Sequence, residues 1–150
     1  MRARLARVAI VTCFALVAIA GNALASLDSF DASYEELADE FPRLLKEKDF
    51  AGLEAFLSPQ LLVQRANGRY ETKEDYLKSP SRIDEYVVTD VVGQSIDNIR
   101  VVRYTLSAVE SIGGLWVTRD PMPRLSTFIW SGERWQLVAH ANFVPMPPAP

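Results

Sequence analysis

The stretch SGERWQLVAHANF, residues 131–143, lies close to the end of the 150-residue chain and holds its only histidine, His140. Its first three residues are a turn signal, because serine and glycine are common where a hairpin reverses. Residues 134–143 then read as a strand, since apolar and polar side chains alternate along most of them. The stretch therefore predicts that the chain ends in a β-hairpin and that the histidine lies on the last strand.

The side chains of this last strand divide between two faces, because successive residues of a strand point in opposite directions. One face holds Gln136, Val138, His140 and Asn142, and the other holds Trp135, Leu137, Ala139 and Ala141. The two sets should therefore have different surroundings.

Further strands separated by turns precede this hairpin. Strand character is found in residues 60–65, 86–94, 99–110 and 124–130. Asp97-Asn98 and Gly113-Gly114 are turn signals between them. Pro121 and Pro123 are expected to separate a ragged segment, residues 115–120, from the strand that follows. Because short turns join neighbouring antiparallel strands, we expect an antiparallel sheet.

The first half of the chain carries helix signals instead. Ser33 and Glu36 form a capping box before an apolar pattern with helical spacing. Pro42 lies within that pattern, so we expect the helix to be kinked or broken there. Asp49 and Thr72 have the character of caps for a second and a third helix.

Helices followed by a meander of strands are typical of an α+β fold. We therefore expect one domain, residues 26–144, with three N-terminal helices packed on one face of a curved antiparallel β-sheet. Such a sheet leaves a cone-shaped space beneath the helices, where a pocket can form. The proline-rich residues 145–150 cannot pair in a sheet and are expected to form a loose tail.

The first 25 residues have the features of a secretory signal peptide. Arg2, Arg4 and Arg7 begin it, an apolar run follows at residues 8–20, and small residues precede Ala25. The apolar run is shorter than the about 20 residues that a membrane span needs. We expect cleavage after Ala25, which predicts a periplasmic or secreted protein without membrane attachment. A retained anchor is the alternative.

Cleavage would leave an acidic chain without thiols. Removing the three leader arginines from 16 basic residues leaves 13 against 19 acidic ones, so we expect no nucleic-acid partner. The only cysteine, Cys13, would be lost as well, and the fold must then depend on its core rather than on disulfides. The single histidine has no second ligand at metal-binding spacing, and no nucleophile motif occurs, so we expect neither metal nor cofactor.

Four short stretches, in their order and spacing, resemble the nuclear transport factor 2-like superfamily, and most closely its SnoaL-like bacterial members. They are DFAGL at residues 49–53, NGR at 67–69, TKEDYL at 72–77 and GERWQLVAH at 132–140. The resemblance covers roughly residues 34–144, and it implies the cone-shaped fold and a homodimer that pairs sheet to sheet. It implies no single activity, because the superfamily includes isomerases, dehydratases, hydrolases and members with no known chemistry.

Ketosteroid isomerases share this fold, but this sequence departs from their catalytic pattern. The resemblance places the family's tyrosine at Phe41 and its general base at Arg65. The strand at residues 125–130 offers no carboxylate for the second acid that such a site needs. Isomerase chemistry of that kind is therefore disfavoured.

The association domain of calmodulin-dependent kinases also has this fold, and arginines line its pocket. One of them follows a glycine by ten residues, as Arg103 follows Gly93 in this sequence. The resemblance implies that Arg103 lies in the pocket, whereas the positions of two further arginines hold Asn142 and a residue near Phe128. The alternative is an exposed Arg103, because a buried arginine requires a partner.

The pocket that the resemblance implies is lined by Tyr34, Phe41, Arg103, Thr105, Phe128, Gln136, Val138, His140 and Asn142. We expect its ligand to be a small molecule with an acidic or polar end, which Arg103 and His140 would contact. Ordinary core packing is the alternative for the aromatic members.

Functions of different classes remain open. The first is an exported small-molecule-binding module without catalysis, since no complete catalytic set is present. The second is a lyase, isomerase or hydrolase in which His140 is the general base and Arg103 stabilises developing negative charge. A third is a structural dimer module whose pocket is filled by its own side chains.

Overall fold

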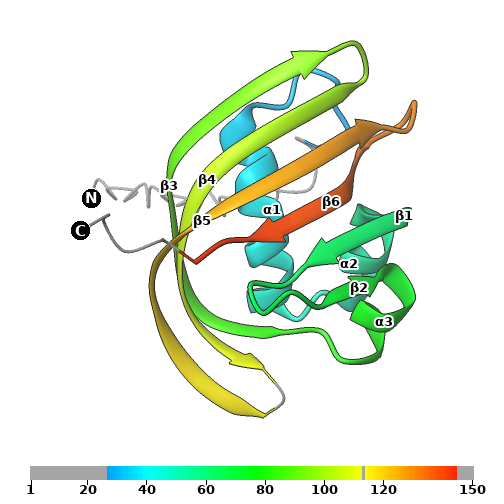
Figure 1. Ribbon diagram of the computed structural model, residues 1–150. Helices are drawn as coiled ribbons and strands as arrows, with labels where there is room; N and C mark the ends of the chain where they lie inside the picture. Colours follow the sequence, from blue (N-terminus) through cyan, green and yellow to red (C-terminus); the bar gives the residue numbers. More distant parts are fainter. Residues whose placement is uncertain (1–26, 113, 145–150) are drawn as a thin grey trace, which may run out of the picture.

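The computed structural model describes residues 27–112 and 114–144. The predicted signal peptide and the proline-rich tail lie outside these residues. Within them, three helices precede most of a six-stranded sheet, and the long helix α1 lies across one face of the curved sheet (Figure 1). The expected α+β class and the curved sheet are confirmed.

Each helix begins at the cap that the sequence predicts. The helices are α1 (Tyr34–Glu47), α2 (Phe50–Phe56) and α3 (Lys73–Lys78). The Ser33 hydroxyl accepts from the Glu36 backbone N–H at 3.1 Å, and the Glu36 carboxylate accepts from the Ser33 N–H at 2.6 Å. Asp49 caps α2 and Thr72 caps α3 in similar ways. These side chains satisfy N–H groups that the first turn of a helix leaves without partners.

Helix α1 continues through Pro42 rather than ending there. Its apolar face, which includes Leu37, Phe41 and Leu44, is buried against the sheet. Most helical stability in proteins comes from such packing, which here outweighs the hydrogen bond that proline cannot donate.

The sheet contains β1 (Leu57–Gln64), β2 (Tyr70–Thr72), β3 (Arg82–Ile96), β4 (Ile99–Ile112), β5 (Leu115–Trp130) and β6 (Trp135–Asn142). Their order across the sheet is β2-β1-β6-β5-β4-β3. All neighbouring pairs are antiparallel except β1 and β6, which are parallel. The turn argument covers only strands that follow each other along the chain, so it could not predict the direction of this pair.

Strand β5 runs through Pro121 and Pro123, where we expected a break. Strand β6 pairs with β5 only as far as Arg124. Among the described residues, the earlier part of β5 therefore pairs with β4 alone, and its other edge has no strand beside it. Proline is tolerated at such an edge, because no ladder hydrogen bond is lost there.

The apolar core lies between α1 and the inner face of the sheet, which is the face that α1 covers. On β4, alternate residues Val102, Tyr104 and Leu106 are buried, so they define this inner face. A segment before α1, residues 27–32, closes one end of the core. In it, the Leu27 carbonyl accepts from the Trp135 backbone N–H at 3.0 Å.

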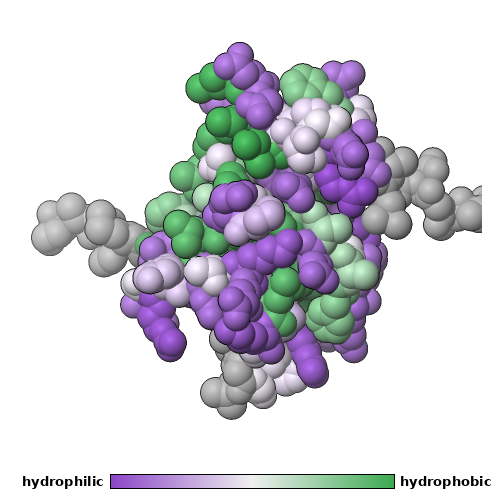
Figure 2. All heavy atoms as spheres, turned by 90° about the vertical axis from the view of Figure 1, so that its right-hand side faces the viewer, coloured by the Kyte–Doolittle hydropathy of each residue, from purple (hydrophilic) through white to green (hydrophobic). Residues whose placement is uncertain are grey.

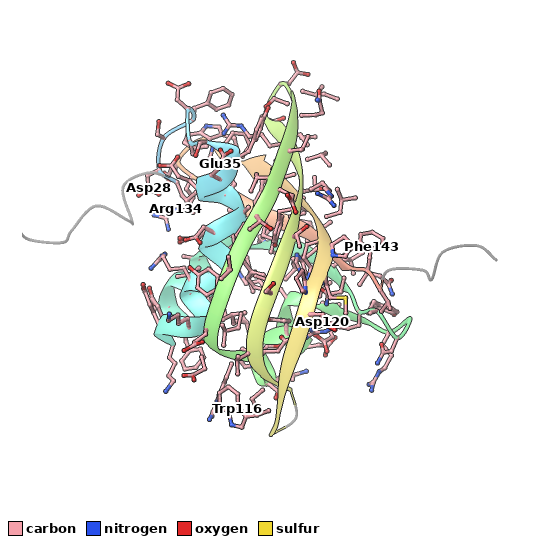
Figure 3. The ribbon with its side chains drawn as sticks, turned by 90° about the vertical axis from the view of Figure 1, so that its left-hand side faces the viewer. Asp28, Glu35, Trp116, Asp120, Arg134 and Phe143 are labelled. Atoms are coloured by element: carbon pink, nitrogen blue, oxygen red, sulfur yellow. The ribbon has the colours of Figure 1, made fainter. Side chains whose placement is uncertain are left out.

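Charged side chains surround this closed end. Asp28 and Arg134 lie beside each other in Figure 3, with 3.4 Å between the carboxylate and the guanidinium. Trp116, in contrast, lies near the tip of the β4–β5 hairpin and is exposed (Figure 3). No helix among the described residues is long and apolar enough to cross a membrane.

Candidate functional site

A small polar cavity lies between α1, α3 and the inner face of β3–β6. Its volume is about 30 Å³, which is room for about two water molecules. Its polar lining consists of Arg65, Tyr76, Ser81, Glu110, Arg124, His140 and Asn142. Its apolar lining consists of Phe41, Pro42, Leu45, Ile83 and Leu106.

Larger hollows occur at the surface but lack this concentration of buried charge. The hollow of about 400 Å³ has no buried charged side chain in its lining, and that of about 620 Å³ includes His140 but none of the buried arginine or glutamate residues. One of about 270 Å³ includes buried Glu40, whose two oxygens already accept from Arg43 at 2.8 Å. A buried titratable group with a shifted pKa in a concave site is a sign of function, so we take the small cavity, which His140 lines with two arginines, as the candidate site.

A β-bulge in β6 brings His140 into this cavity. Thr127 of β5 pairs with Ala139, but the next residue, Phe128, pairs with Leu137, so Val138 is an extra residue on β6. An extra residue reverses the alternation of side chains beyond it. Leu137 and His140 consequently both face inward, although they are three residues apart.

Both ring nitrogens of His140 are hydrogen-bonded. Nε2 lies 2.9 Å from Asn142 Oδ1, and Nδ1 lies 2.9 Å from Ser126 Oγ. The amide oxygen can only accept, so Nε2 carries a proton, and in the neutral imidazole Nδ1 is then an acceptor for the Ser126 hydroxyl. Ser126 Oγ is also 3.5 Å from the Tyr104 hydroxyl, which extends the network into the core. This arrangement suits a neutral imidazole.

The surroundings of His140 also oppose its protonation. Burial lowers its pKa to about 3, and the positive charges of Arg124 and Arg65 act in the same direction. The hydrogen bond to Asn142 opposes this shift only in part. At neutral pH the side chain is therefore an uncharged hydrogen-bonding group, which is a poor match for a general base that should titrate near the working pH.

Two arginines from different strands converge on the cavity. Arg124 of β5 is 4% exposed, and its Nη1 donates to the Pro123 carbonyl at 3.1 Å. Arg65 follows β1, and its Nε and Nη2 donate to Glu71 Oε2 at 3.1 and 2.6 Å. Buried Glu110 adds one negative charge to the lining. The lining thus carries two cationic groups and one anionic group.

Tyr76 links these groups to the core. It projects from α3, and its ring lies 5.5 Å from that of Phe41 and 5.3 Å from the Arg65 guanidinium carbon. Burial raises its pKa to about 12, although Arg65 and hydrogen bonds from Ser81 act against the shift. It is therefore a neutral phenol at physiological pH.

The structure places three of the sequence-predicted pocket residues in the cavity wall: Phe41, His140 and Asn142. Two others lie elsewhere. Arg103 is exposed on the outer face of the sheet, where its Nη1 donates to the Asp90 carbonyl at 3.2 Å. Thr105, two residues further on, shares that face. The expected position of Arg103 inside the pocket is thereby corrected.

The remaining predicted residues lie outside the cavity lining. Gln136 is half-buried and donates to the Ala55 carbonyl at 3.0 Å, while Val138 is the extra residue of the bulge. Phe128 is a core residue beside Phe56. Tyr34 packs against Gly93, where an added Cβ would approach its ring to 2.3 Å.

Arg124, Arg65 and Glu110 were missing from the predicted pocket. Strand alternation could have found Arg124, because it shares a face with Phe128 through even spacing along β5. The same rule puts Glu110 on the face of Val102 and Tyr104. Arg65 lies after β1, where alternation gives no direction, but the resemblance had put it at the position of the family's general base.

The lining offers little for a metal ion. Among residues 27–112 and 114–144, no group of three or more histidine, cysteine, aspartate or glutamate side chains is arranged to hold one. The two arginines are instead suited to hold an anionic group, because a guanidinium presents several N–H donors.

Comparison of the fold with solved structures gives many matches. A nuclear transport factor 2-like protein from Cytophaga hutchinsonii superimposes with a TM-score of 0.66 at 16% identity, covering 74% of this chain and 94% of that one. A nuclear transport factor 2-like protein of unknown function in nutrient uptake, from Rhodospirillum rubrum, gives 0.65 at 20% identity, with coverages of 75% and 96%.

A candidate calcium/calmodulin-dependent kinase II association domain from Exiguobacterium sibiricum gives 0.64 at 18% identity, with coverages of 77% and 92%. Other matches include proteins described as a candidate ketosteroid isomerase and a candidate scytalone dehydratase. No protein-family model and no curated protein matches the sequence. The chain therefore has the nuclear transport factor 2-like fold, as its sequence resemblance implied.

Proposed function

We propose that this protein is a small-molecule-binding module of the SnoaL-like kind, and that its cavity receives the carboxylate of an anionic ligand. The observation that carries the proposal is the convergence of Arg124 with a neutral His140 in a buried cavity. A guanidinium presents paired N–H donors that match a carboxylate. The Tyr76 hydroxyl is an additional polar group of the same lining, and the His140 Nε2–H can reach a ligand only if the ligand displaces Asn142 Oδ1.

The donors of the lining favour an anion over a cation as the ligand. Arg65 and Arg124 both contribute guanidinium groups to the lining, although Glu71 already pairs with Arg65 from outside it. Guanidinium groups only donate hydrogen bonds, so they suit a carboxylate and not a cation. The ligand's acidic end, as the sequence suggested, would be met by Arg124 in place of Arg103.

Replacing Arg124 with methionine should weaken binding of acetate and benzoate by at least about tenfold, since a charged hydrogen bond is worth about 1.5–3 kcal/mol. The shift of the single His140 imidazole signal in NMR measures binding. Arg103→Met on the outer face is the matched control and should bind as the unmodified protein does. Arg124→Lys, which keeps the charge, should fall between them.

The opposite pattern would contradict this site. If Arg103→Met loses binding and Arg124→Met retains it, the ligand lies on the outer face. If circular dichroism shows that Arg124→Met is unfolded, the carboxylate affinity of Arg124→Lys is the test instead, and an affinity equal to that of the unmodified protein would contradict a role for the guanidinium. Absence of binding by any carboxylate in the unmodified protein would exclude the function itself.

No observation favours the catalytic alternative. Its general base, His140, has a pKa of about 3, and its proposed charge stabiliser, Arg103, lies on the outer face. We therefore propose binding without catalysis.

We also propose that the outer face of the sheet pairs with a second copy of this chain. A hollow of about 620 Å³ on that face is lined mainly by apolar residues of β1, β2, β5 and β6, including Leu62, Tyr70 and Leu125. These three side chains are exposed in the single chain, and large exposed apolar patches mark interaction sites. In contrast, hydrophilic and hydrophobic residues are intermixed on the neighbouring side of the molecule (Figure 2).

Replacing Leu62 with lysine should convert the dimer to a monomer, because two charges would be buried at a symmetric interface. Sedimentation equilibrium measures the mass of each form. Val92→Lys is the control, since Val92 is equally exposed on β3 but lies outside the hollow. A monomeric unmodified protein would rule out the dimer.

Export remains part of the proposal because of the leader-like first 25 residues. Mass spectrometry of the protein purified from cells tests the export proposal. The measured mass should be that of a chain that begins at Ser26. An intact N-terminus would exclude cleavage at this position.

A further inference from the structure

The cavity is too small for the ligand that the proposed function requires. Its volume of about 30 Å³ accommodates about two water molecules, which is less than a carboxylate with even a short carbon chain. Most lining residues are also buried, among them His140, Arg124 and Tyr76. If the proposed binding function is correct, one wall of the cavity must move to admit a ligand.

The wall with the shortest elements is the cover segment, residues 66–80, which contains β2 and α3 and is anchored in the core through Tyr76. Strand β2 has three residues, lies at the edge of the sheet and pairs only with the end of β1. Helix α3 has six residues. The other walls are α1, the start of the long edge strand β3 and the central strands β4, β5 and β6. Short edge elements open at a lower free-energy cost than the core does.

The two ends of the cover segment are turns. Gly68 has a φ of +86°, which glycine adopts without strain, and its N–H donates to the Arg65 carbonyl at 3.0 Å. Ser79, after α3, has φ −151° and ψ 69°, outside the helical region. Gly68 and Ser79 therefore have backbone angles outside those of helices and strands. Both are positions where the backbone direction can change.

One ion pair joins the cover segment to the sheet at the cavity itself. Arg65 precedes the cover segment, whereas Glu71 lies on β2 and belongs to it. The pair has two hydrogen bonds, from Arg65 Nε at 3.1 Å and from Nη2 at 2.6 Å. The same guanidinium also covers the ring of Tyr76, the residue with which α3 closes the cavity.

We propose that Glu71 is an internal competitor of the ligand. By pairing with Arg65, its carboxylate holds the cover segment closed over the cavity. A ligand carboxylate that binds Arg124 and also takes the place of Glu71 on Arg65 releases β2, Tyr76 moves outward, and the cavity enlarges. The Arg65–Glu71 ion pair is thus an autoinhibitory contact: it blocks ligand entry until an anionic ligand replaces Glu71 on Arg65.

A second contact limits the movement to a rotation. Lys73, the first residue of α3, donates from Nζ to the carbonyls of Glu54 and Leu57, each at 2.6 Å. These bonds tie the start of α3 to the end of α2 and do not involve Arg65 or Glu71. They hold one end of the helix in place while Tyr76, three residues later, swings away from the cavity.

Glu71→Gln tests this latch, because the amide keeps the shape of the side chain and removes its charge. Hydrogen exchange should become at least about threefold faster in residues 70–78 and remain unchanged in the central strands. Acetate should bind at least about threefold more tightly, as followed by the His140 imidazole signal. The matched control is Glu74→Gln, which removes an exposed partner of Lys78 on the same helix and should change neither quantity.

The two readouts separate this inference from the function on which it rests. Unchanged exchange in Glu71→Gln, or equal acceleration in Glu74→Gln, overturns the latch. Equal acetate affinity in all three proteins despite faster exchange overturns the competition. Faster exchange without acetate binding to any form supports the latch and overturns the proposed binding function instead.

Discussion

Replacement of Trp135 with alanine is expected to lower the free energy of unfolding by about 4 kcal/mol, near the upper part of the range for buried aromatic residues. The side chain is 1% exposed. Its ring lies 5.5 Å from that of Phe30, and the Arg100 guanidinium is centred 4.4 Å above it. Its Nε1 donates to the Ser29 and Phe30 carbonyls at 3.1 and 3.3 Å.

The loss combines two effects. A large cavity would remain where the indole was, and the carbonyls of the segment at residues 27–32 would lose a donor. Urea unfolding followed by circular dichroism measures the change. Trp116→Ala is the control, because Trp116 is 59% exposed and its loss should change stability by less than about 0.5 kcal/mol. Equal effects of the two substitutions would show that the indole of Trp135 does not organise the core.

Acidification is expected to destabilise the protein through His140. Its pKa is about 3 in the folded state and about 6.5 in the unfolded chain. Above both values neither state is protonated, so the residue contributes nothing to the pH dependence. Between them the unfolded chain binds a proton that the folded protein does not, and the free energy of unfolding falls by up to about 1.4 kcal/mol per pH unit as the pH decreases.

The charged groups around the imidazole explain why the pKa of His140 is lowered. Arg124 on β5 and Arg65 after β1 oppose a positive charge on the imidazole, while Glu110 on β4 is the acidic member of the same lining. On the side of α1, the imidazole ring lies 5.2 Å from that of Phe41. The helix residues of the cavity lining, Phe41, Pro42, Leu45 and Tyr76, carry no carboxylate that would favour protonation.

Two measurements check this expectation. The NMR signal of the imidazole should remain that of the neutral form at pH 5, and a titration midpoint near 6.5 would refute the buried environment. Urea unfolding at pH 7 and pH 4.5 should show a larger loss of stability in the unmodified protein than in His140→Asn. Both proteins contain the same carboxylates. Subtracting the loss of stability in His140→Asn from that in the unmodified protein therefore leaves the contribution of His140.

The local signals in the sequence predicted the local structure well. Ser33, Asp49 and Thr72 cap helices because their side chains satisfy nearby backbone N–H groups, and this depends only on neighbouring residues. The Asp97-Asn98 turn connects paired residues Ile96 and Ile99 for the same reason. The fold class followed from the order of these elements.

Side-chain direction was harder to predict, and Arg103 shows why. In the segment around it, Val102, Tyr104 and Leu106 alternate with polar residues, so alternation alone puts Arg103 outside. The resemblance in spacing between Gly93 and Arg103 pointed the other way and was misleading. A shift of one residue moves every side chain of a strand to the opposite face, so distant resemblance is a weak guide to such positions.

The cavity itself could not be derived from one stretch of sequence. Its charged groups come from β4, β5 and the end of β1, and each occurs in a segment with no unusual composition. The bulge at Val138 also leaves no mark in the sequence, because a valine in a strand is ordinary. Only the pairing of β6 with β5 shows that Leu137 and His140 face the same way.

The parallel pairing of β1 with β6 has a consequence for the order in which the protein folds. These strands lie far apart along the chain, and β6 is the last element, so their contact closes a very long loop. Closure of such loops slows folding, since their entropy is lost before the contact forms. The helices and the β3–β4 hairpin can form while later residues are still being synthesised. His140 reaches Arg65 only when β6 docks beside β1, so the binding cavity is assembled in the final step.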